Sequence, residues 1–241
     1  DSLGYVKSYV GGPDFSFFQY DMVTAGRRQV GSTIKPLLYT FAMEEGRTPC
    51  DEELNSQPVL YDGNGRAWTP RDAGKERIGE MVTLRWGLMK SNNWISARVM
   101  SKLSPEAFVE KLHAFGIKAK LEPVLSLCLG VCDLSVEEMV TAYSSFVGHG
   151  QRSTPIYVTS ICDNSGIEID HFEPIIKEVF SFDSYLKMLP ILRDVIDRGT
   201  GGRIRSRYKI KAPMGGKTGT TNDNSDGWFM SFTPSLVAGC W

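Results

Sequence analysis

Residues 27–46 read RRQVGSTIKPLLYTFAMEEG, and apolar residues recur in this stretch with the spacing of a helix. The apolar positions are Ile34, Leu37, Leu38 and Phe41. Gly46 follows the last apolar turn, where glycine commonly ends a helix. The stretch therefore predicts a buried helix over residues 32–45.

Helical patterns continue through the middle of the chain, after a loop. Residues 47–80 are rich in Gly, Pro, Asp and Asn, and we expect a long loop there, of a length often linked to function. Further helices are expected over residues 82–91, in two segments within residues 94–117, and over residues 135–150. Ser135 and Glu138 have the spacing of a capping box at the start of the last of these helices.

Strand patterns occur near the N-terminus and in the last third of the chain. Residues 4–12 predict one strand, and residues 154–169 predict a hairpin around a DNSG turn. A helix is expected over residues 181–202, and three antiparallel strands with short turns are expected from residue 209 to the end, with one turn in NDNSDG, residues 222–227. The fold class is therefore α/β of the α+β layered kind, a sheet with helices on its faces.

The composition excludes several classes of protein. The 241 residues carry a formal net charge of −1, so nothing points to nucleic acid or to an anionic membrane surface. No apolar run reaches the roughly 20 residues that span a bilayer, and no signal peptide is recognisable. Both ends read as parts of strands, so we expect the chain to be part of a longer protein.

The five cysteines favour neither a metal site nor a disulfide framework. No CxxC pair occurs, and none of the three histidines stands near a cysteine, so we expect no metal. Cys128 and Cys132 could form a bridge, although small buried side chains are the more ordinary interpretation.

Ser32 and Lys35 form the first candidate motif. Residues i and i+3 share one face of a helix, so the lysine amine can reach the serine hydroxyl. A desolvated, neutral lysine can act as a base toward serine, and a helix N-terminus favours a developing anion. The alternative is an ordinary N-cap serine followed by a surface lysine.

Two further motifs offer polar groups in loops and strands. Ser91 and Asn93 interrupt a helical pattern, where Ser91 could pass a proton and Asn93 could hold a substrate amide; the alternative is an N-cap for the next helix. The other motif offers a charge, hydroxyls and a glycine that permits close backbone approach; the alternative is a polar edge strand. Its residues are Lys217, Thr218, Gly219, Thr220 and Thr221.

Taken together and in this order, the three motifs resemble the signature of serine β-lactamases and penicillin-binding proteins. RRQVGSTIKP (residues 27–36) is similar to the RQPGSxxKP segment of class A, bifunctional penicillin-binding proteins. AWTPRD (67–72), SLCLGVCDLSVEEMVTAYSSFVGHG (126–150) and GGKTGTTNDNSDGWFMSFTPSLVAGCW (215–241) are similar to further segments of that family.

Four residues depart from the family pattern. Val30 replaces the usual proline, Asp72 replaces the usual asparagine, and Cys128 and Cys132 replace small residues. We expect none of the four to touch a proposed catalytic group.

The resemblance implies a five-stranded antiparallel sheet between helices, with an all-helical subdomain, as in the β-lactamase and transpeptidase folds. The sheet part would take up residues 1–46 and 150–241, and the helical part residues 47–149. The family's glycosyltransferase domain and membrane anchor would lie outside this chain, which would work at the extracytoplasmic face of the bacterial membrane.

The resemblance also implies a peptidoglycan D,D-transpeptidase without a cofactor, inhibited by β-lactams that acylate Ser32. Its partners would be stem peptides ending in D-Ala-D-Ala. Ser32 would be the nucleophile and Lys35 its base, with an oxyanion hole from the Ser32 and Thr220 N–H groups. Ser91 and a lysine amine would protonate the leaving D-Ala, and Asn93 would hold the donor peptide. The substrate-binding residues would be Lys217, Thr218, Gly219, Thr220 and Thr221.

Three rival functions remain open. A D,D-carboxypeptidase would use the same motifs with water as acceptor. A serine β-lactamase would need a deacylating glutamate; the stretch DEELN (residues 51–55) has a suitable composition but precedes Ser91, the wrong order. A β-lactam sensor without catalysis would not need the complete set of motif residues.

Overall fold

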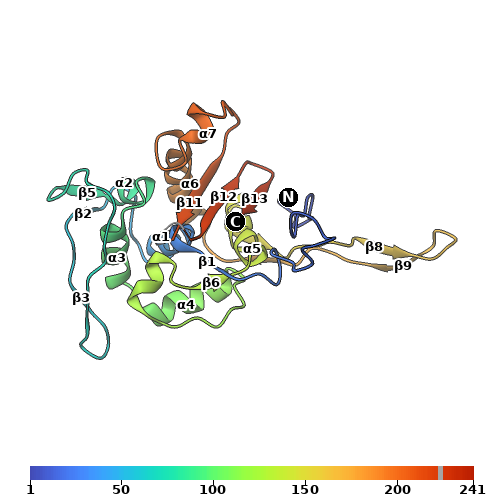
Figure 1. The fold of residues 1–241 in the computed structure, drawn as a ribbon, viewed down its shortest axis with the longest axis horizontal. Helices are drawn as coiled ribbons and strands as arrows, with labels where there is room; N and C mark the ends of the chain where they lie inside the picture. The colour runs from blue at the N-terminus through green and yellow to red at the C-terminus, as the bar shows by residue number, and fades with distance from the viewer. Residues whose placement is uncertain (222–224) are drawn as a thin grey trace.

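The central helix of the fold is α1, Lys35–Glu44, preceded by a 3₁₀ turn, η1, Gly31–Ile34. A computed structural model describes residues 1–221 and 225–241, and α1 lies near the middle of the molecule in Figure 1. Nine of the ten residues of α1 are buried, as its apolar spacing predicts. Gly46 ends the helix with φ +87°, a conformation that glycine adopts without strain, so the predicted helix and its C-terminal glycine are confirmed.

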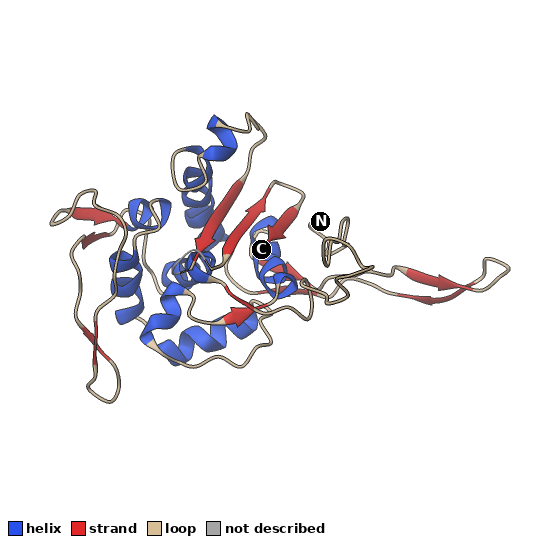
Figure 2. Ribbon diagram, viewed as in Figure 1, coloured by secondary structure: helices blue, strands red, loops and turns tan. Residues whose placement is uncertain are grey.

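The sheet beside α1 has three antiparallel strands in the order β11, β12, β13. Their bounds are Gly215–Thr220, Gly227–Phe232 and Val237–Cys240, which confirms the three strands predicted at this end of the chain. Helix α6, Phe182–Asp197, packs on β11, and α5, Val136–Val147, packs on β12 and β13 (Figures 1 and 2). The turn expected at 222–227 lies partly outside the described residues.

The strand predicted over residues 4–12 is wrong. Only Tyr5 makes a bridge, parallel to Ile156, and Val6 donates its N–H to the Ile156 carbonyl at 3.0 Å. The backbone groups of Gly4 and Val6 thus form hydrogen bonds with Ile156 and do not pair with β13. Among residues 1–221 and 225–241, β11 to β13 are therefore the whole of this sheet, and the five strands expected are not found.

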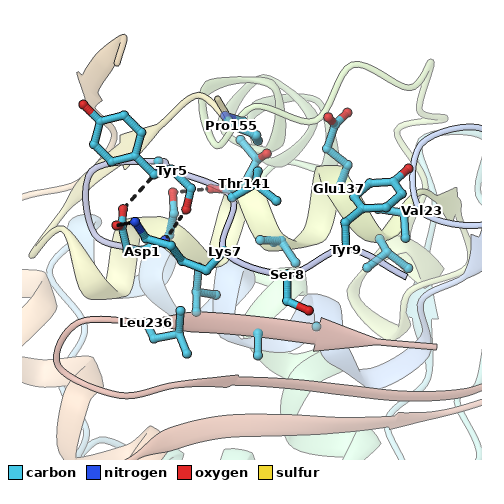
Figure 3. A pocket seen from close by; sticks show the side chains of 18 of the residues that line it. Asp1, Tyr5, Lys7, Ser8, Tyr9, Val23, Glu137, Thr141, Pro155 and Leu236 are labelled. Atoms are coloured by element: carbon cyan, nitrogen blue, oxygen red, sulfur yellow. Dashed lines mark hydrogen bonds and ion pairs between the residues drawn. The ribbon is translucent and has the colours of Figure 1, made fainter. Parts of the chain in front are cut away.

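A cavity of about 530 Å³ lies between this N-terminal segment, α5 and β13. Figure 3 shows Lys7 and Asp1 toward one end of it and Tyr9 and Glu137 toward the other. Its walls include none of the candidate catalytic or substrate-binding residues, so the cavity is separate from the site that the motifs predict.

The helices predicted between residues 82 and 150 are confirmed, with their caps. They are α2, Leu84–Met89; α3, Asn93–Ser101; α4, Pro105–Ala114; and α5. Ser135 and Glu138 form the predicted capping box at α5. Because α5 packs on the sheet, it joins the two parts into which the resemblance divides the chain; that division stays a prediction.

Short ladders occupy the remaining loops. Residues 47–80 are mainly loop, as expected, with β2 paired to β5 and β3 paired to β4. The predicted hairpin is present as β8 and β9, and it projects far from the body of the molecule in Figure 1. The short elements are β1, Arg28–Gln29; β2, Glu52–Leu54; β3, Leu60–Tyr61; β4, Ala67–Trp68; β5, Met81–Thr83; η2, Leu125–Leu129; β6, Asp133–Leu134; β7, Gln151–Ser153; β8, Ser160–Cys162; β9, Glu168–His171; β10, Ile176–Glu178; and α7, Arg203–Ser206.

All five cysteines are free thiols. Cys128 is fully buried, so the interpretation as a small core side chain is correct for it and the Cys128–Cys132 bridge is not formed. Within the described part of the chain, no helix combines the length and the apolar character needed to cross a bilayer.

Candidate active site

Ser32 lies in the turn η1, which two backbone hydrogen bonds fasten to the chain around η2. Val30 donates its N–H to the Cys132 carbonyl at 3.1 Å, and Gly31 donates to the Gly130 carbonyl at 3.2 Å. Ser32 itself is only half-buried, and its hydroxyl has no hydrogen bond to any residue in the described ranges. Its oxygen is thus accessible on a firmly held backbone.

Strand β11 passes directly beside this turn. A Cβ atom at Gly219 would lie 2.7 Å from the Val30 carbonyl oxygen, and one at Gly31 would lie 3.0 Å from that of Thr220. The contact at Gly219 is tighter than side chains tolerate, and at Gly31, whose φ is +52°, a Cβ atom would force the Thr220 backbone to shift, so glycine suits both positions. The close backbone approach expected at Gly219 is therefore present, and it brings the third motif next to the first.

The amine of Lys35 is fully buried and faces the second motif. Its Nζ donates to the Ser91 carbonyl at 2.7 Å and to Asn93 Oδ1 at 2.6 Å, and it lies 3.4 Å from Ser91 Oγ. The described residues include no hydrogen bond between Lys35 and Ser32, so the role of Lys35 as a base stays a prediction. The alternative of a surface lysine is wrong.

Ser91 is held in an unusual backbone conformation. Its φ is +59°, a region that costs a residue other than glycine about 1–3 kcal/mol. Asn92, and not Ser91, caps helix α3, accepting from the Ile95 N–H at 2.9 Å. The N-cap alternative thus applies to Asn92, and the side chains of Ser91 and Asn93 are left to contact Lys35.

Lys217 completes the constellation from the other side. It is fully buried, and its Nζ donates to Ser91 Oγ at 2.8 Å and to the Thr218 carbonyl at 2.9 Å. The Ser91 hydroxyl therefore lies between the Lys35 and Lys217 amines. The structure brings all three motifs together around one hydroxyl.

Burial of the two amines controls their charge. Desolvation lowers the pKa of Lys35 to about 8, although Cys128 and Asp72 act in the opposite direction. Desolvation, with repulsion from Lys35, lowers the pKa of Lys217 well below its usual value. Two like charges beside one hydroxyl oppose each other, so the pair loses its first proton at a lower pH than two separate exposed lysines would.

Asp72 contradicts the expectation that the departures from the family pattern avoid the catalytic groups. Asp72 Oδ1 accepts the backbone N–H of Asn93 at 2.6 Å. The charge of Asp72 acts on Lys35 to raise its pKa, whereas burial raises the pKa of Cys128 to about 12, so this thiol stays neutral beside the amine. Asp72 belongs to the surroundings of the site, and sequence reasoning missed it.

The threonines of the third motif differ in their surroundings. Thr218 Oγ1 donates to Thr200 Oγ1 at 2.7 Å, while Thr220 is exposed. Thr221 exchanges hydrogen bonds with Asp226, whose N–H donates to the Thr221 hydroxyl at 2.9 Å. Thr200 is a second polar neighbour that the sequence did not reveal; its GTG segment, residues 199–201, was the available signal.

The DEELN stretch lies at the edge of this site and has a structural role. Glu53 binds Arg47 at 2.8 Å and is also paired with Lys102. Asn55 Oδ1 accepts from Asn92 Nδ2 at 2.9 Å, which supports the turn that carries Ser91. The hydrogen bonds of Glu53 among residues 1–221 and 225–241 are those from Arg47 and Lys102, so its contacts give no support to a role as a deacylating glutamate.

No metal is implied by the geometry of the site. The described ranges contain no group of three or more His, Cys, Asp or Glu side chains placed to hold a metal ion. The chemistry that the arrangement offers is nucleophilic attack by a serine with buried amines to move protons.

Comparisons with known proteins point to one family. A family model for the penicillin binding protein transpeptidase domain matches residues 4–237. Penicillin-binding protein 1A of Aquifex aeolicus is 31% identical over 239 residues, covering 99% of this chain and 32% of that protein. The protein of the same name from Rickettsia conorii is 32% identical over 265 residues, covering 100% of this chain and 33% of that protein.

A solved structure agrees with the sequence relatives. The crystal structure of Penicillin-binding protein 1A from Haemophilus influenzae has a TM-score of 0.88 and 26% sequence identity, over 95% of this chain and 40% of that one. The chain thus spans about a third of the length of the curated relatives it matches.

Proposed function

This chain belongs to the family of penicillin-binding protein transpeptidase domains, and we propose that it is a peptidoglycan D,D-transpeptidase that works through an acyl-enzyme on Ser32. The observation that carries the proposal is the Ser91 hydroxyl held between two buried amines, 2.8 Å from Lys217 Nζ and 3.4 Å from Lys35 Nζ. A buried amine that binds only neutral oxygens in the described part of the chain is costly to a fold, so two of them sharing the Ser91 hydroxyl favour proton transfer as their use.

In the acylation step, neutral Lys35 takes the proton of Ser32 while the serine oxygen attacks the carbonyl carbon of the penultimate D-Ala. The backbone N–H groups of Ser32 and Thr220 stabilise the oxyanion. The C–N bond then breaks, and Ser91 passes a proton from Lys217 or Lys35 to the leaving D-Ala nitrogen.

In the second step, an amine from a neighbouring peptidoglycan strand attacks the ester carbon. The new amide forms the cross-link and the proton returns to the site as Ser32 leaves. Asn93 holds the donor peptide, and its Oδ1 lies 2.6 Å from Lys35 Nζ, so peptide position and proton transfer are coupled through one side chain.

The donor peptide binds along β11. This strand pairs with β12 on one side, and its other edge carries no strand in the described part of the chain, so an extended peptide can lie against it. Lys217 supplies charge for the terminal carboxylate, Thr218, Thr220 and Thr221 supply hydroxyls, and Gly219 keeps the approach open.

We place this reaction in the cell wall. The relatives of this chain are about three times as long as the chain, which leaves room in a longer protein for a glycosyltransferase domain and for a membrane anchor at the extracytoplasmic face. β-Lactams resemble the D-Ala-D-Ala end, and they acylate Ser32 as inhibitors.

A donor peptide ending in D-Ala-D-Ala, supplied with a D-amino acid as acceptor, tests the proposal. We expect D-Ala release and a product carrying the acceptor, both abolished in Ser32→Ala. Release of D-Ala without acceptor incorporation would identify a carboxypeptidase. Rapid turnover of penicillin would identify a β-lactamase, and the absence of any reaction in the folded, full-length protein would leave a sensor.

A further inference from the structure

Asp72 holds the turn that carries Ser91 and Asn93 in place. Its Oδ1 accepts the Asn93 N–H at 2.6 Å, and its Oδ2 accepts from Asn92 Nδ2 at 3.2 Å. Oδ2 also accepts the Gly74 N–H at 3.0 Å, which fixes the carboxylate within its own loop. One carboxylate therefore ties residues 72–74 to the N-terminus of α3.

The same turn delivers both acceptors of the Lys35 amine. Asn93 Oδ1 and the Ser91 carbonyl accept from Nζ at 2.6 Å and 2.7 Å. Any displacement of the Asn93 backbone therefore moves an atom that contacts Lys35. Asp72 makes no hydrogen bond with the amine itself, so its effect on Lys35 is transmitted through the turn and through its charge.

Among the titratable groups of the described residues that act on the Lys35 amine, Asp72 is the one that carries a negative charge. Lys217 faces the amine from β11 across Ser91, and the Cys128 thiol of η2 is the other titratable group that acts on the Lys35 pKa. The thiol is neutral and the second amine is repulsive, so Asp72 supplies the negative charge that favours the protonated form of Lys35.

We propose that Asp72 is a positioning residue of the active site, which holds the Ser91–Asn93 turn against Lys35 and keeps a negative charge beside its amine. This inference rests on the proposed function, because it assigns Asp72 to the acylation step. It gives a role to a residue that replaces the asparagine expected from the family resemblance.

Two consequences separate charge from geometry. Asp72→Asn removes the charge but keeps an oxygen for the Asn93 N–H, giving up the bonds that Oδ2 accepts from Asn92 at 3.2 Å and from Gly74 at 3.0 Å. It therefore lowers the pH at which Lys35 loses its proton, and it should lower the maximal acylation rate at high pH less than Asp72→Ala does, because the bond to the Asn93 N–H is kept. Asp72→Ala shifts the same midpoint and also lowers the maximal rate, since no acceptor remains for the Asn93 N–H.

The first measurement does not depend on catalysis. In the full-length protein, lysine side chains carry ¹³C at Cε, and the Lys35 resonance is assigned by its loss in Lys35→Met. We expect the titration midpoint of Lys35 to fall by roughly 1 pH unit in Asp72→Asn, the size expected for a nearby opposite charge. Asp72→Ser, which also removes the charge, provides a second variant with the same expected shift.

Asp62→Asn is the matched control. Asp62 is half-buried like Asp72 and likewise accepts loop N–H groups, those of Asn64 and Arg66 at 2.9 Å, but it lies in the turn between β3 and β4. It should leave the Lys35 midpoint unchanged.

The second measurement is the rate of Ser32 acylation by a labelled penicillin against pH. The low-pH side of the profile should move with the NMR midpoint, so that Asp72→Asn reacts up to roughly tenfold faster well below that midpoint. An Asp72→Asn variant that melts like the wild type but keeps the wild-type midpoint would overturn the inference. A shifted midpoint in a protein that never acylates Ser32 would support the placement of Asp72 and overturn the proposed function instead.

Discussion

Two of the clusters of ionisable side chains in this chain are built in opposite ways around buried groups. The amine cluster, Lys35, Ser91 and Lys217, holds two fully buried cations that bind hydroxyl, carbonyl and amide oxygens. The ion-pair cluster, Arg47, Asp51, Glu53 and Lys102, matches two cations with two carboxylates.

The difference appears in the charge states. In the amine cluster, desolvation lowers the pKa of both lysines, that of Lys35 to about 8, so these amines lose their protons at a lower pH than exposed lysines do. In the ion-pair cluster, burial opposes ionisation of Glu53, but hydrogen bonds from Lys102 and Arg47 outweigh it and hold its pKa below the usual value. A balanced cluster keeps its charges fixed and stabilises a loop, whereas an unbalanced one can exchange protons and serve chemistry.

The largest expected effect comes from matched lysine substitutions in the two clusters. Lys35→Ala should slow acylation of Ser32 by roughly 10²–10⁴-fold, and Lys35→Arg should not rescue it, because arginine cannot lose its proton. Lys102→Arg should keep both the contact with Glu53 and the acylation rate. Stopped-flow acylation by a fluorescent penicillin, with melting temperatures, checks all three. Near-normal acylation by Lys35→Arg would exclude Lys35 as the base.

The next effect is a dependence of stability on pH. The pKa of Lys35 falls from 10.5 in the unfolded chain to about 8 in the fold, so the unfolded chain binds more protons between these values. Stability should therefore rise with pH from about 8 to 10.5, by about 3 kcal/mol in total for this one group. Lys35→Met should lack this rise, and it also relieves the repulsion on Lys217. Urea unfolding at several pH values measures the difference, and equal slopes in both proteins would contradict it.

A smaller effect is expected from the ion-pair cluster. Glu53→Gln leaves the Arg47 and Lys102 charges without their shared partner, and it should cost about 2 kcal/mol, between the values for buried and exposed pairs. Denaturant unfolding gives the loss. Acylation per folded molecule should stay at the wild-type rate. A faster or slower formation of the acyl-enzyme would show that the cluster takes part in the chemistry.

The smallest effect is expected at Asp51, at the exposed side of the same cluster. Asp51→Asn weakens the 2.6 Å pair with Arg47 but keeps Thr48 as a hydrogen-bond partner, so it should cost only about 0.5 kcal/mol. A loss as large as that of Glu53→Gln would mean that the cluster depends on charge number and not on the burial of Glu53.

The sequence predicted what depends on local spacing. The apolar spacing around Ile34 predicted α1. Helix spacing predicted that Ser32 and Lys35 share one face, and the family resemblance predicted that their motif meets those of Ser91 and Lys217. The free state of Cys128 also agreed with the more ordinary of two interpretations.

The contacts of Asp72 and the pairing of residues 4–12 were beyond the sequence. Asp72 stands in a loop without periodicity, so nothing local shows that its carboxylate reaches Asn93. The alternation in residues 4–12 indicates a strand. Its hydrogen bonds to Ile156 depend on tertiary contacts, which a local sequence pattern cannot predict. The contact of Thr218 with Thr200 is tertiary in the same way.

The site and lifetime of the penicillin adduct show whether the buried amine cluster activates Ser32. The folded chain is treated with a labelled penicillin, and intact mass and peptide mapping locate the label in wild type and in Lys35→Arg. We predict one adduct per wild-type chain, on Ser32, lasting minutes or longer, which corresponds to a deacylation barrier of roughly 20 kcal/mol or more, and no adduct in Lys35→Arg within the time that labels the wild type completely. Label on another residue, or equal labelling of Ser32 in the two proteins, would contradict the claim that the buried amine cluster activates this serine.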